Sequence, residues 1–306
     1  FRIDDSVILN NNFYPGSFLD KKNRQGTLAT EFGAGTRVDF SNNKADGTNS
    51  EFLNTLTDPH GWRAGFFFHL GGNQEMLLIS NNTATCTGDK IGDGEAFSFD
   101  NNGNTFGFDN TKIVIKATPT TITILGPLLS KQNNRDIQIS NYYQGHWIQI
   151  TEGPGRGQSR KISTYNIDLK TQQITFTISV EWDVLPVSGK STVTIGKQFW
   201  QVYTVNNLID HRQPTCKKSN LSDKKGGSIA LWAQTSDSVV DSNHQFDTDG
   251  IILRTFFSSS GQFCKDCRTE TNTMNSVEIR NNTIEGEYAW ENHCSSSGIK
   301  IDLGAA

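Results

Sequence analysis

Short segments in which apolar and polar positions alternate recur along the chain, and turns rich in Gly, Asn and Pro separate them. Between residues 61 and 125 they include GWRAGFFFHL, QEMLLIS, KIVIKA and TITIL. From about residue 136 they continue as DIQIS, HWIQITE, SRKISTY, QITFTISV, STVTIG and FWQVYTV. Strands separated by about 8 to 12 residues are typical of an all-β sandwich or solenoid. Residues 1 to 60 have few continuous apolar runs, which predicts loops and short strands there.

Residues 203 to 302 contain a repeat. Three segments run from apolar residues into an Asn-bearing turn, namely TVNNLID, SVVDSN and SVEIRNNTIEG, and three strands follow a glycine, namely GGSIALWA, DGIILRTF and SGIKID. Asn206 and Asn243 are 37 residues apart, and Asn243 and Asn281 are 38 apart, which is close to a period. Inward β-branched side chains and stacked Asn side chains at the bends are what a parallel β-helix needs.

The run GGSIALWAQTSDSVVDSNHQFDTDGIIL, with NSVEIRNNTIEG and SGIKI, resembles the secreted right-handed parallel β-helix proteins, the superfamily of pectate lyases and polygalacturonase-like glycosidases. The resemblance covers about residues 200 to 303, extends back to 135, and covers the first 130 residues poorly. It implies an extracellular protein that binds or cleaves a polysaccharide on the exposed face of one parallel sheet. We therefore expect an all-β fold in which 131–306 form the right-handed solenoid. Residues 1–130 would form less regular β-rich coils and loops, or the start of the same solenoid.

The segment HQFDTDG, from His244 to Gly250, carries the first catalytic candidates. It resembles the Asn-Thr-Asp-Gly element of polygalacturonase-like enzymes, with Asp247 at the position of the Asn and Asp249 at that of the aspartate. Hydrolases of this kind use carboxylates as general acid and base. The paired Asp-Asp, Gly-His-Gly and Arg-Ile-Lys elements of those enzymes are missing. An Asp-Gly turn that enters a strand is also ordinary corner chemistry, so both interpretations remain open.

A second candidate cluster is Asp210-His211-Arg212, which several lysines, among them Lys217, follow in the sequence. A lyase can use a basic residue to abstract a proton and other cations to hold uronate carboxylates. The alternative is a solvated loop between coils. Because His211 and His244 each follow an Asn-bearing turn, the two clusters are predicted to approach one face.

Trp232 and Trp290 each lie at a strand end among polar residues and are candidates to stack on sugar rings, whereas core packing is the default for the other tryptophans. Asp89, Asp93 and Glu95 lie in an acidic, Gly-rich stretch. Carboxylates at irregular spacing are acceptable Ca²⁺ ligands, so a calcium site is a further hypothesis. No other cofactor is indicated.

Composition narrows the possible partners. Formal net charge is −4 and mean hydropathy is −0.50, and the basic residues are scattered rather than gathered into a stripe. Nucleic acid is therefore not an expected partner. No apolar run approaches the roughly 20 residues of a membrane-spanning helix. The first residue is Phe1 rather than Met, so the chain is interpreted as mature or trimmed.

Five cysteines and three glycosylation sequons favour the outside of the cell, secreted or on the surface. The predicted disulfide participants are Cys216, Cys264, Cys267 and Cys294, which leaves Cys86 as an unpaired buried thiol. The sequons begin at Asn81, Asn220 and Asn281.

A non-enzymatic function is the alternative to polysaccharide binding or cleavage. A β-helix has open sheet edges at its ends unless they are capped. The last predicted strand, Ile299 to Leu303, has no evident cap after it, so the chain can be a fragment or can self-associate through the solenoid ends. In that case it would be a structural or adhesive subunit of an extracellular assembly.

Overall fold

The computed structural model is all-β in the part of the chain that it describes, with 24 strands and no helix. The described residues are 2–13, 31–32, 34–46, 68–70, 74–86, 95–100, 112–125, 143–213, 228–232, 235–248, 250–254, 274–286 and 299–302. Two compact units are present. One comprises Phe1–Asp100, Phe199–Arg254 and Ser276–Leu303, and the other Asn101–Gln198, Thr255–Asn275 and Gly304–Ala306.

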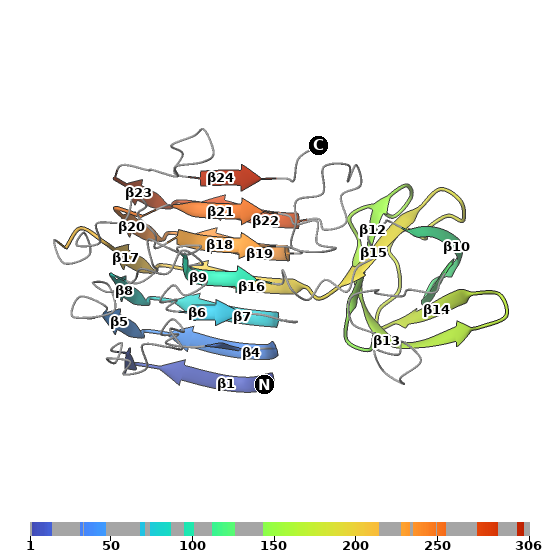
Figure 1. Ribbon diagram of the computed structural model, residues 1–306, viewed down its shortest axis with the longest axis horizontal. Helices are drawn as coiled ribbons and strands as arrows, with labels where there is room; N and C mark the ends of the chain where they lie inside the picture. The colour runs from blue at the N-terminus through green and yellow to red at the C-terminus, as the bar shows by residue number, and fades with distance from the viewer. Residues whose placement is uncertain are drawn as a thin grey trace, which may run out of the picture. The chain divides into compact units, whose positions relative to one another are not determined.

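The first unit contains three parallel sheets of six strands each (Figure 1). Sheet A has the order β1 (Arg2–Leu9), β4 (Ala34–Ser41), β7 (Gln74–Ser80), β16 (Phe199–Val205), β19 (Thr235–Asp241) and β22 (Met274–Arg280). Sheet B has β2 (Asn12–Phe13), β5 (Lys44–Asp46), β8 (Thr83–Thr85), β17 (Leu208–Asp210), β20 (His244–Phe246) and β23 (Thr283–Glu285). Sheet C has β3 (Glu31–Phe32), β6 (Phe68–Leu70), β9 (Glu95–Asp100), β18 (Ser228–Trp232), β21 (Ile251–Arg254) and β24 (Ile299–Asp302).

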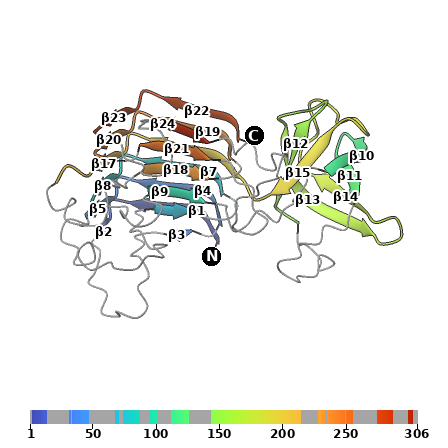
Figure 2. The same cartoon turned by 45° about the horizontal axis from the view of Figure 1, so that its top comes forward.

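The chain visits the three sheets in a fixed order. Strands β1, β2 and β3 belong to sheets A, B and C in turn, and the same sequence of sheets repeats five more times. We call each set of three strands a round. Successive rounds add strands in the same order to every sheet, as Figure 2 shows from a second direction.

A ladder of asparagines joins the rounds at the corner between sheets A and B. Its members are Asn11, Asn43, Asn82, Asn207, Asn243 and Asn282. The Oδ1 atom of Asn207 accepts hydrogen bonds from the backbone N and the Nδ2 of Asn82, at 3.0 and 2.9 Å. Its Nδ2 donates to Oδ1 of Asn243 and to the carbonyl of Ile79, both at 2.9 Å. The amide of Asn207 is fully buried and its polar atoms are paired, as a buried polar group requires.

The residue before each ladder asparagine adopts a left-handed backbone conformation, which turns the chain from one sheet to the next. These residues are Asn10, Asn42, Asn81, Asn206, Ser242 and Asn281, with φ between 53° and 60°. Asn tolerates this conformation better than most residues, which explains the Asn-Asn pairs in the sequence. The periodic residues predicted from the sequence, Asn206 and Asn281, are thus the outward turn residues. The stacked ones are their neighbours.

A second column of left-handed residues crosses sheet A. Its members are Asp5, Arg37, Met76, Gln201, Asp237 and Ser276, with φ between 50° and 55°. The register skips this position, because Thr36 pairs with Glu75 and Val38 with Leu77. One residue is thereby inserted into the alternation of every strand of sheet A, as in a β-bulge.

The interior of this unit also contains large apolar side chains. Its largest fully buried side chains include Phe40, Leu77, Ile79, Phe97, Phe99 and Phe199, and the rings of Phe99 and Phe199 meet edge to face at 6.0 Å. Burial of a large apolar side chain contributes about 1.5 to 3 kcal/mol. The buried apolar side chains therefore supply most of the stabilisation between rounds. The asparagine ladder fixes the register of the rounds.

The second unit is a closed antiparallel barrel of six strands. They are β10 (Lys112–Thr118), β11 (Thr121–Leu125), β14 (Gln173–Ile178), β13 (Ser159–Asp168), β12 (Trp147–Glu152) and β15 (Thr192–Gly196), in the order of pairing. Val114, Ile122, Ile148, Phe176 and Val193 are among its core residues, and all are fully buried.

The structure divides the chain differently from the expected boundary at residue 130. Parallel strands already occur in residues 2–100 and begin again at Phe199, whereas the strands between residues 112 and 196 form the barrel. The segments HWIQITE, SRKISTY and QITFTISV are therefore antiparallel barrel strands and not β-helix strands. The ladder continues across the insertion, because Asn82 bonds to Asn207 over 125 residues of sequence. No sequence period can cross an inserted unit of this size.

Loss of one ladder side chain is expected to destabilise the parallel-sheet unit. Asn207→Ala leaves the carbonyl of Ile79 and the amide of Asn82 without their partners in a buried place. Each unsatisfied group costs about 1 to 3 kcal/mol, so urea unfolding should show a loss of about 3 kcal/mol. Asn206→Gly is the control, since glycine keeps the left-handed turn. An equal loss in both variants would contradict the account.

The barrel should lose stability in acid through His146. Burial, with a smaller effect of the Lys197 ammonium, lowers the pKa of His146 from 6.5 to about 4. In the unfolded chain the imidazole of His146 therefore becomes protonated near pH 6.5. In the folded barrel it becomes protonated only near pH 4. The stabilisation is complete above pH 6.5 and declines by up to about 3 kcal/mol as the pH falls to 4. Hydrogen exchange of barrel amides should show this decline, and His146→Leu should flatten it. The same pH dependence in both proteins would contradict the assignment.

Candidate functional site

The structure brings the two sequence-predicted clusters together on sheet B. Strands β17 and β20 are neighbours, with Asp210 opposite Phe246. The guanidinium of Arg212 lies over the ring of Phe246, 3.8 Å from its centroid. It also binds Asp210 through two contacts, Nε to Oδ1 at 3.0 Å and Nη2 to Oδ2 at 2.7 Å. The cluster is a cation held between a carboxylate and an aromatic ring.

This pairing fixes the charge of both partners. The hydrogen bond from Arg212 lowers the pKa of Asp210, and the bond to Asp210 raises the pKa of Arg212. Arg212 therefore stays protonated and is unsuited to abstract a proton, although its charge can attract an anion. The backbone N of Arg212 also donates to Oδ1 of Asp210 at 3.0 Å, and the charges of Glu285 and Asp247 act on the guanidinium.

The two histidines occupy different positions. His244 is exposed and lies opposite Leu208, whereas His211 is only 6% exposed and its backbone N donates to the carbonyl of Phe246. His244 begins β20, whereas His211 directly follows the end of β17, the neighbouring strand of sheet B. The structure thus places the two histidines beside neighbouring strands and in different environments.

The segment that follows β20 forms a corner. Asp247 has φ 54°, and its backbone N donates to the carbonyl of Glu285 at 2.8 Å. Thr248 is fully buried. Its hydroxyl donates to Oε1 of Gln245 at 3.1 Å and accepts the amide of Gly250 at 3.2 Å. These contacts account for the Asp-Thr-x-Gly sequence as a turn. Asp249 lies outside the described residues.

Several other sequence candidates fall outside the described part of the chain. They are Asp89, Asp93, Lys217, Asn220, Trp290, Cys216, Cys264, Cys267 and Cys294. Trp232 and Glu95 lie in described strands, and their side chains are outside the description. Among the described residues, no group of three or more His, Cys, Asp or Glu could hold a metal ion.

Cys86 is the one cysteine in the described ranges. It is 6% exposed and takes part in a disulfide. The expectation that Cys86 is the unpaired thiol is therefore wrong.

The sequons at Asn81 and Asn281 are explained by the corner between sheets A and B. Each first Asn is the exposed left-handed residue, each second Asn belongs to the ladder, and Thr83 or Thr283 begins the next strand. A sequon arises wherever the third residue of this motif is a threonine. Both first asparagines remain exposed.

The outward face of sheet A contains an aromatic pair that the sequence patterns did not single out. Trp200 and Tyr203 both belong to β16, and Tyr203 is 38% exposed. Residues three apart normally point to opposite faces of a strand. The left-handed Gln201 between them shifts the alternation, so that both rings lie on the outward side, while Val202 is buried. No sequence signal marks this shift.

Trp200 is held in place by a carboxylate of the next round. Its Nε1 donates to Oδ2 of Asp237 at 2.8 Å. In the register of sheet A, Trp200 lies opposite Glu75 on one side and Ser236 on the other. An indole thus lies between two carboxylate-bearing strands.

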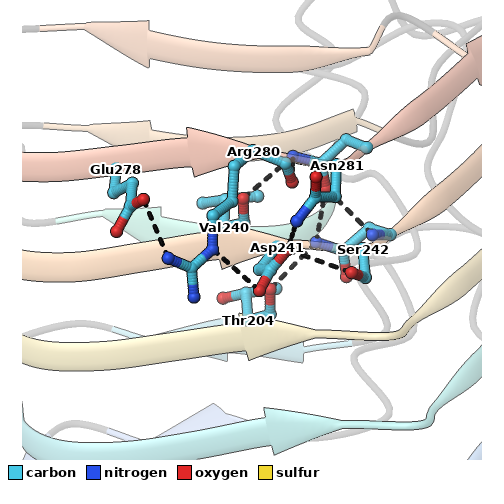
Figure 3. A network of polar contacts seen from close by, with 9 residues as sticks. Thr204, Val240, Asp241, Ser242, Glu278, Arg280 and Asn281 are labelled. Atoms are coloured by element: carbon cyan, nitrogen blue, oxygen red, sulfur yellow. Dashed lines mark hydrogen bonds and ion pairs between the residues drawn. The ribbon is translucent and has the colours of Figure 1, made fainter.

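A polar network lies where sheet A ends, at the corner between sheets A and B (Figure 3). Arg280 binds Asp241 through Nε at 3.0 Å and Glu278 through Nη1 at 2.8 Å. Asn281 and Ser242 also donate to Oδ1 of Asp241. Chiefly the hydrogen bond from Arg280 lowers the pKa of Asp241, so that this carboxylate stays ionised and holds the corner.

No family model matches the chain, and no curated protein matches it. In the ranges that the structure describes, no helix is long and apolar enough to span a membrane.

Removal of the Arg212 guanidinium should raise the pKa of Asp210. Arg212→Gln removes the charged donor that stabilises the carboxylate, so the ¹³C-detected titration of Asp210 should move to higher pH. Arg156→Gln, in the barrel, serves as the control and should leave the titration unchanged. An unshifted Asp210 in Arg212→Gln would show that the pair does not form in solution.

Proposed function

We propose that the six rounds wind as a right-handed parallel β-helix, and that this extracellular protein binds an extended polysaccharide along the outward face of sheet A. The repeated order of three parallel sheets supports the winding. Crossover connections between parallel strands of one sheet are right-handed in about 98% of cases, which supports the hand. The resemblance to pectate lyase and polygalacturonase-like proteins agrees with both parts of the proposal.

The aromatic pair on β16 carries the binding proposal. A sugar ring presents apolar C–H groups that pack on an aromatic face, and its hydroxyls bond to flanking carboxylates. Tyr203 is 38% exposed, and the bond from Trp200 to Asp237 fixes the indole before a ligand arrives. A ring that is already oriented loses less entropy on binding than a free one.

The dimensions of the face suit a polymer. Six strands spaced by about 4.8 Å extend over roughly 24 Å from the first round to the last. The side chains of each outward column repeat at this spacing, so a linear chain laid across the strands can contact several rounds at once. A small ligand would use only part of this surface.

The disulfide of Cys86 supports an extracellular location, because disulfides persist in oxidising compartments. The cluster of Asp210, Arg212 and Phe246 on sheet B would contribute less to glycan binding. Arg212 is already bound by Asp210 and Phe246, so it can contribute a fixed positive charge and no proton-accepting group.

Truncation of the aromatic pair should weaken glycan binding. Affinity electrophoresis against neutral and acidic polysaccharides is expected to show retardation of the wild-type protein by at least one polymer. Trp200→Ala and Tyr203→Ala should each weaken that binding about tenfold, a typical loss for a central aromatic contact.

Leu208→Ala is the matched control, since Leu208 belongs to the same round and lies on sheet B. Equal effects of all three variants would place binding elsewhere. No retardation by any polymer, with a protein that runs as a multimer, would favour the structural or adhesive alternative.

A further inference from the structure

We propose that one end of the barrel docks on a membrane surface that contains anionic lipids. The residues that contact the lipid belong to the connection between β14 and β15, residues 179–191, and to the start of β10. This surface is part of the barrel unit, whereas the proposed glycan face belongs to sheet A of the other unit. The two binding functions are therefore independent.

Exposed aliphatic side chains gather on this surface. The backbone N–H of Gly189 donates to the carbonyl of Val114 at 2.9 Å, and the hydroxyl of Ser188 donates to the carbonyl of Ile115 at 2.6 Å. The connection therefore lies along β10. The aliphatic residues of the two segments are 36 to 58% exposed, and we call them the loop face: Ile113, Ile115, Val184, Leu185 and Val187. Large apolar side chains exposed on one surface mark a protein or membrane contact.

The backbone of the connection is bonded by side chains of the barrel. Oε1 of Gln158 accepts the backbone N–H groups of Asp183 and Val184, at 2.7 and 3.1 Å. Its Nε2 donates to the carbonyl of Val184 at 2.8 Å, and Oγ of Ser191 accepts the backbone N–H of Val187 at 2.9 Å. Hydrocarbon offers no hydrogen bonds, so a loop can approach it only where its backbone polar groups are bonded within the protein. These bonds also order the connection before it binds, which lowers the entropy cost of docking.

Basic side chains flank the aliphatic ones. Lys116 is on β10, Lys190 is in the connection, and Arg156 is in the turn between β12 and β13. All three are exposed, and none has an ion-pair partner among the described residues. The carboxylate of Asp183 is bound by Arg160 at 2.8 Å, so its charge is compensated.

The barrel is basic although the whole chain is acidic. Its described residues, 112–125 and 143–198, include eight Lys and Arg against four Asp and Glu, whereas the full chain has 28 against 32. Near the loop face the exposed acids Glu152 and Glu181 are outnumbered by the three free cations. An anionic lipid surface therefore attracts the barrel more strongly than the rest of the chain.

The composition of the loop face favours lipid over a protein partner. Protein interfaces are enriched in aromatic side chains and depleted of lysine. The exposed side chains of the loop face are aliphatic, and Lys116 and Lys190 lie beside them. Segments that lie on membranes combine aliphatic and basic residues in this way. A symmetric contact with a second copy would bring these cations against one another.

Vesicle cosedimentation of the full chain is the direct test. The protein should sediment with vesicles of phosphatidylcholine and phosphatidylserine, and it should remain in solution with phosphatidylcholine alone. Added salt should weaken binding to the mixed vesicles, because it screens the attraction between the cations and the headgroups.

Two variants of the docking surface should weaken vesicle binding. Leu185→Ser should lower the affinity about tenfold, since it removes an aliphatic side chain from the lipid contact. Lys190→Gln should lower it about fivefold, since it removes one charge near an anionic surface. The matched controls are Leu169→Ser and Lys170→Gln, in the exposed turn between β13 and β14. That turn precedes β14 and the connection follows it, so both controls should bind like wild type.

Absence of sedimentation with the anionic vesicles would overturn the proposal. Equal losses in Leu185→Ser and Leu169→Ser would overturn it too, because binding would then not depend on the loop face. Sedimentation velocity separates the remaining occupant: a wild-type dimer that Leu185→Ser converts to a monomer would assign the loop face to a second copy instead. Thermal unfolding of the variants should match wild type, since the substituted side chains are exposed.

Discussion

The hydrogen-bonded ladder of buried asparagines is the interaction on which the parallel-sheet unit depends. Each internal ladder amide, such as that of Asn207, bonds to the rounds before and after it and to a strand carbonyl. A one-residue slip of any round would leave these buried groups without partners. The apolar core supplies cohesion, and the ladder supplies register. Since the outward columns depend on that register, the candidate site depends on it too.

The left-handed residue in each strand of sheet A determines which side chains point outward. Without the extra residue at Gln201, Trp200 and Tyr203 would lie on opposite faces of β16. With it, both aromatic rings and the exposed Asp237 belong to the outward face. The same device recurs in every round, so the face is continuous across the inserted barrel sequence. Local backbone geometry therefore determines which chemistry the sheet can present.

The all-β class could be predicted from the sequence because alternation and turn residues are local signals. The Asn-bearing turns were also visible, but Asn206 and Asn207 are the same residue type, and the sequence pointed to the outward one. The barrel was missed because WIQITE and its neighbours alternate in the same way as parallel strands, and strand direction is set by pairing partners. Trp200 and Tyr203 were missed because a period of two places them on opposite faces. Trp200 and Asp237 are 37 residues apart in sequence, and only the stacking of rounds brings their side chains into contact.

The central claim is that the outward face of sheet A receives a glycan at Trp200. The most direct measurement is the ¹⁵N–¹H spectrum of the tryptophan indoles during titration with neutral and acidic oligosaccharides. The Trp200 indole signal, which reports the bond to Asp237, should shift in a saturable way, while the signals of Trp147 and Trp182 in the barrel stay in place. Shifts confined to the barrel tryptophans, or an unmoved Trp200 signal with a glycan that the protein binds, would contradict it.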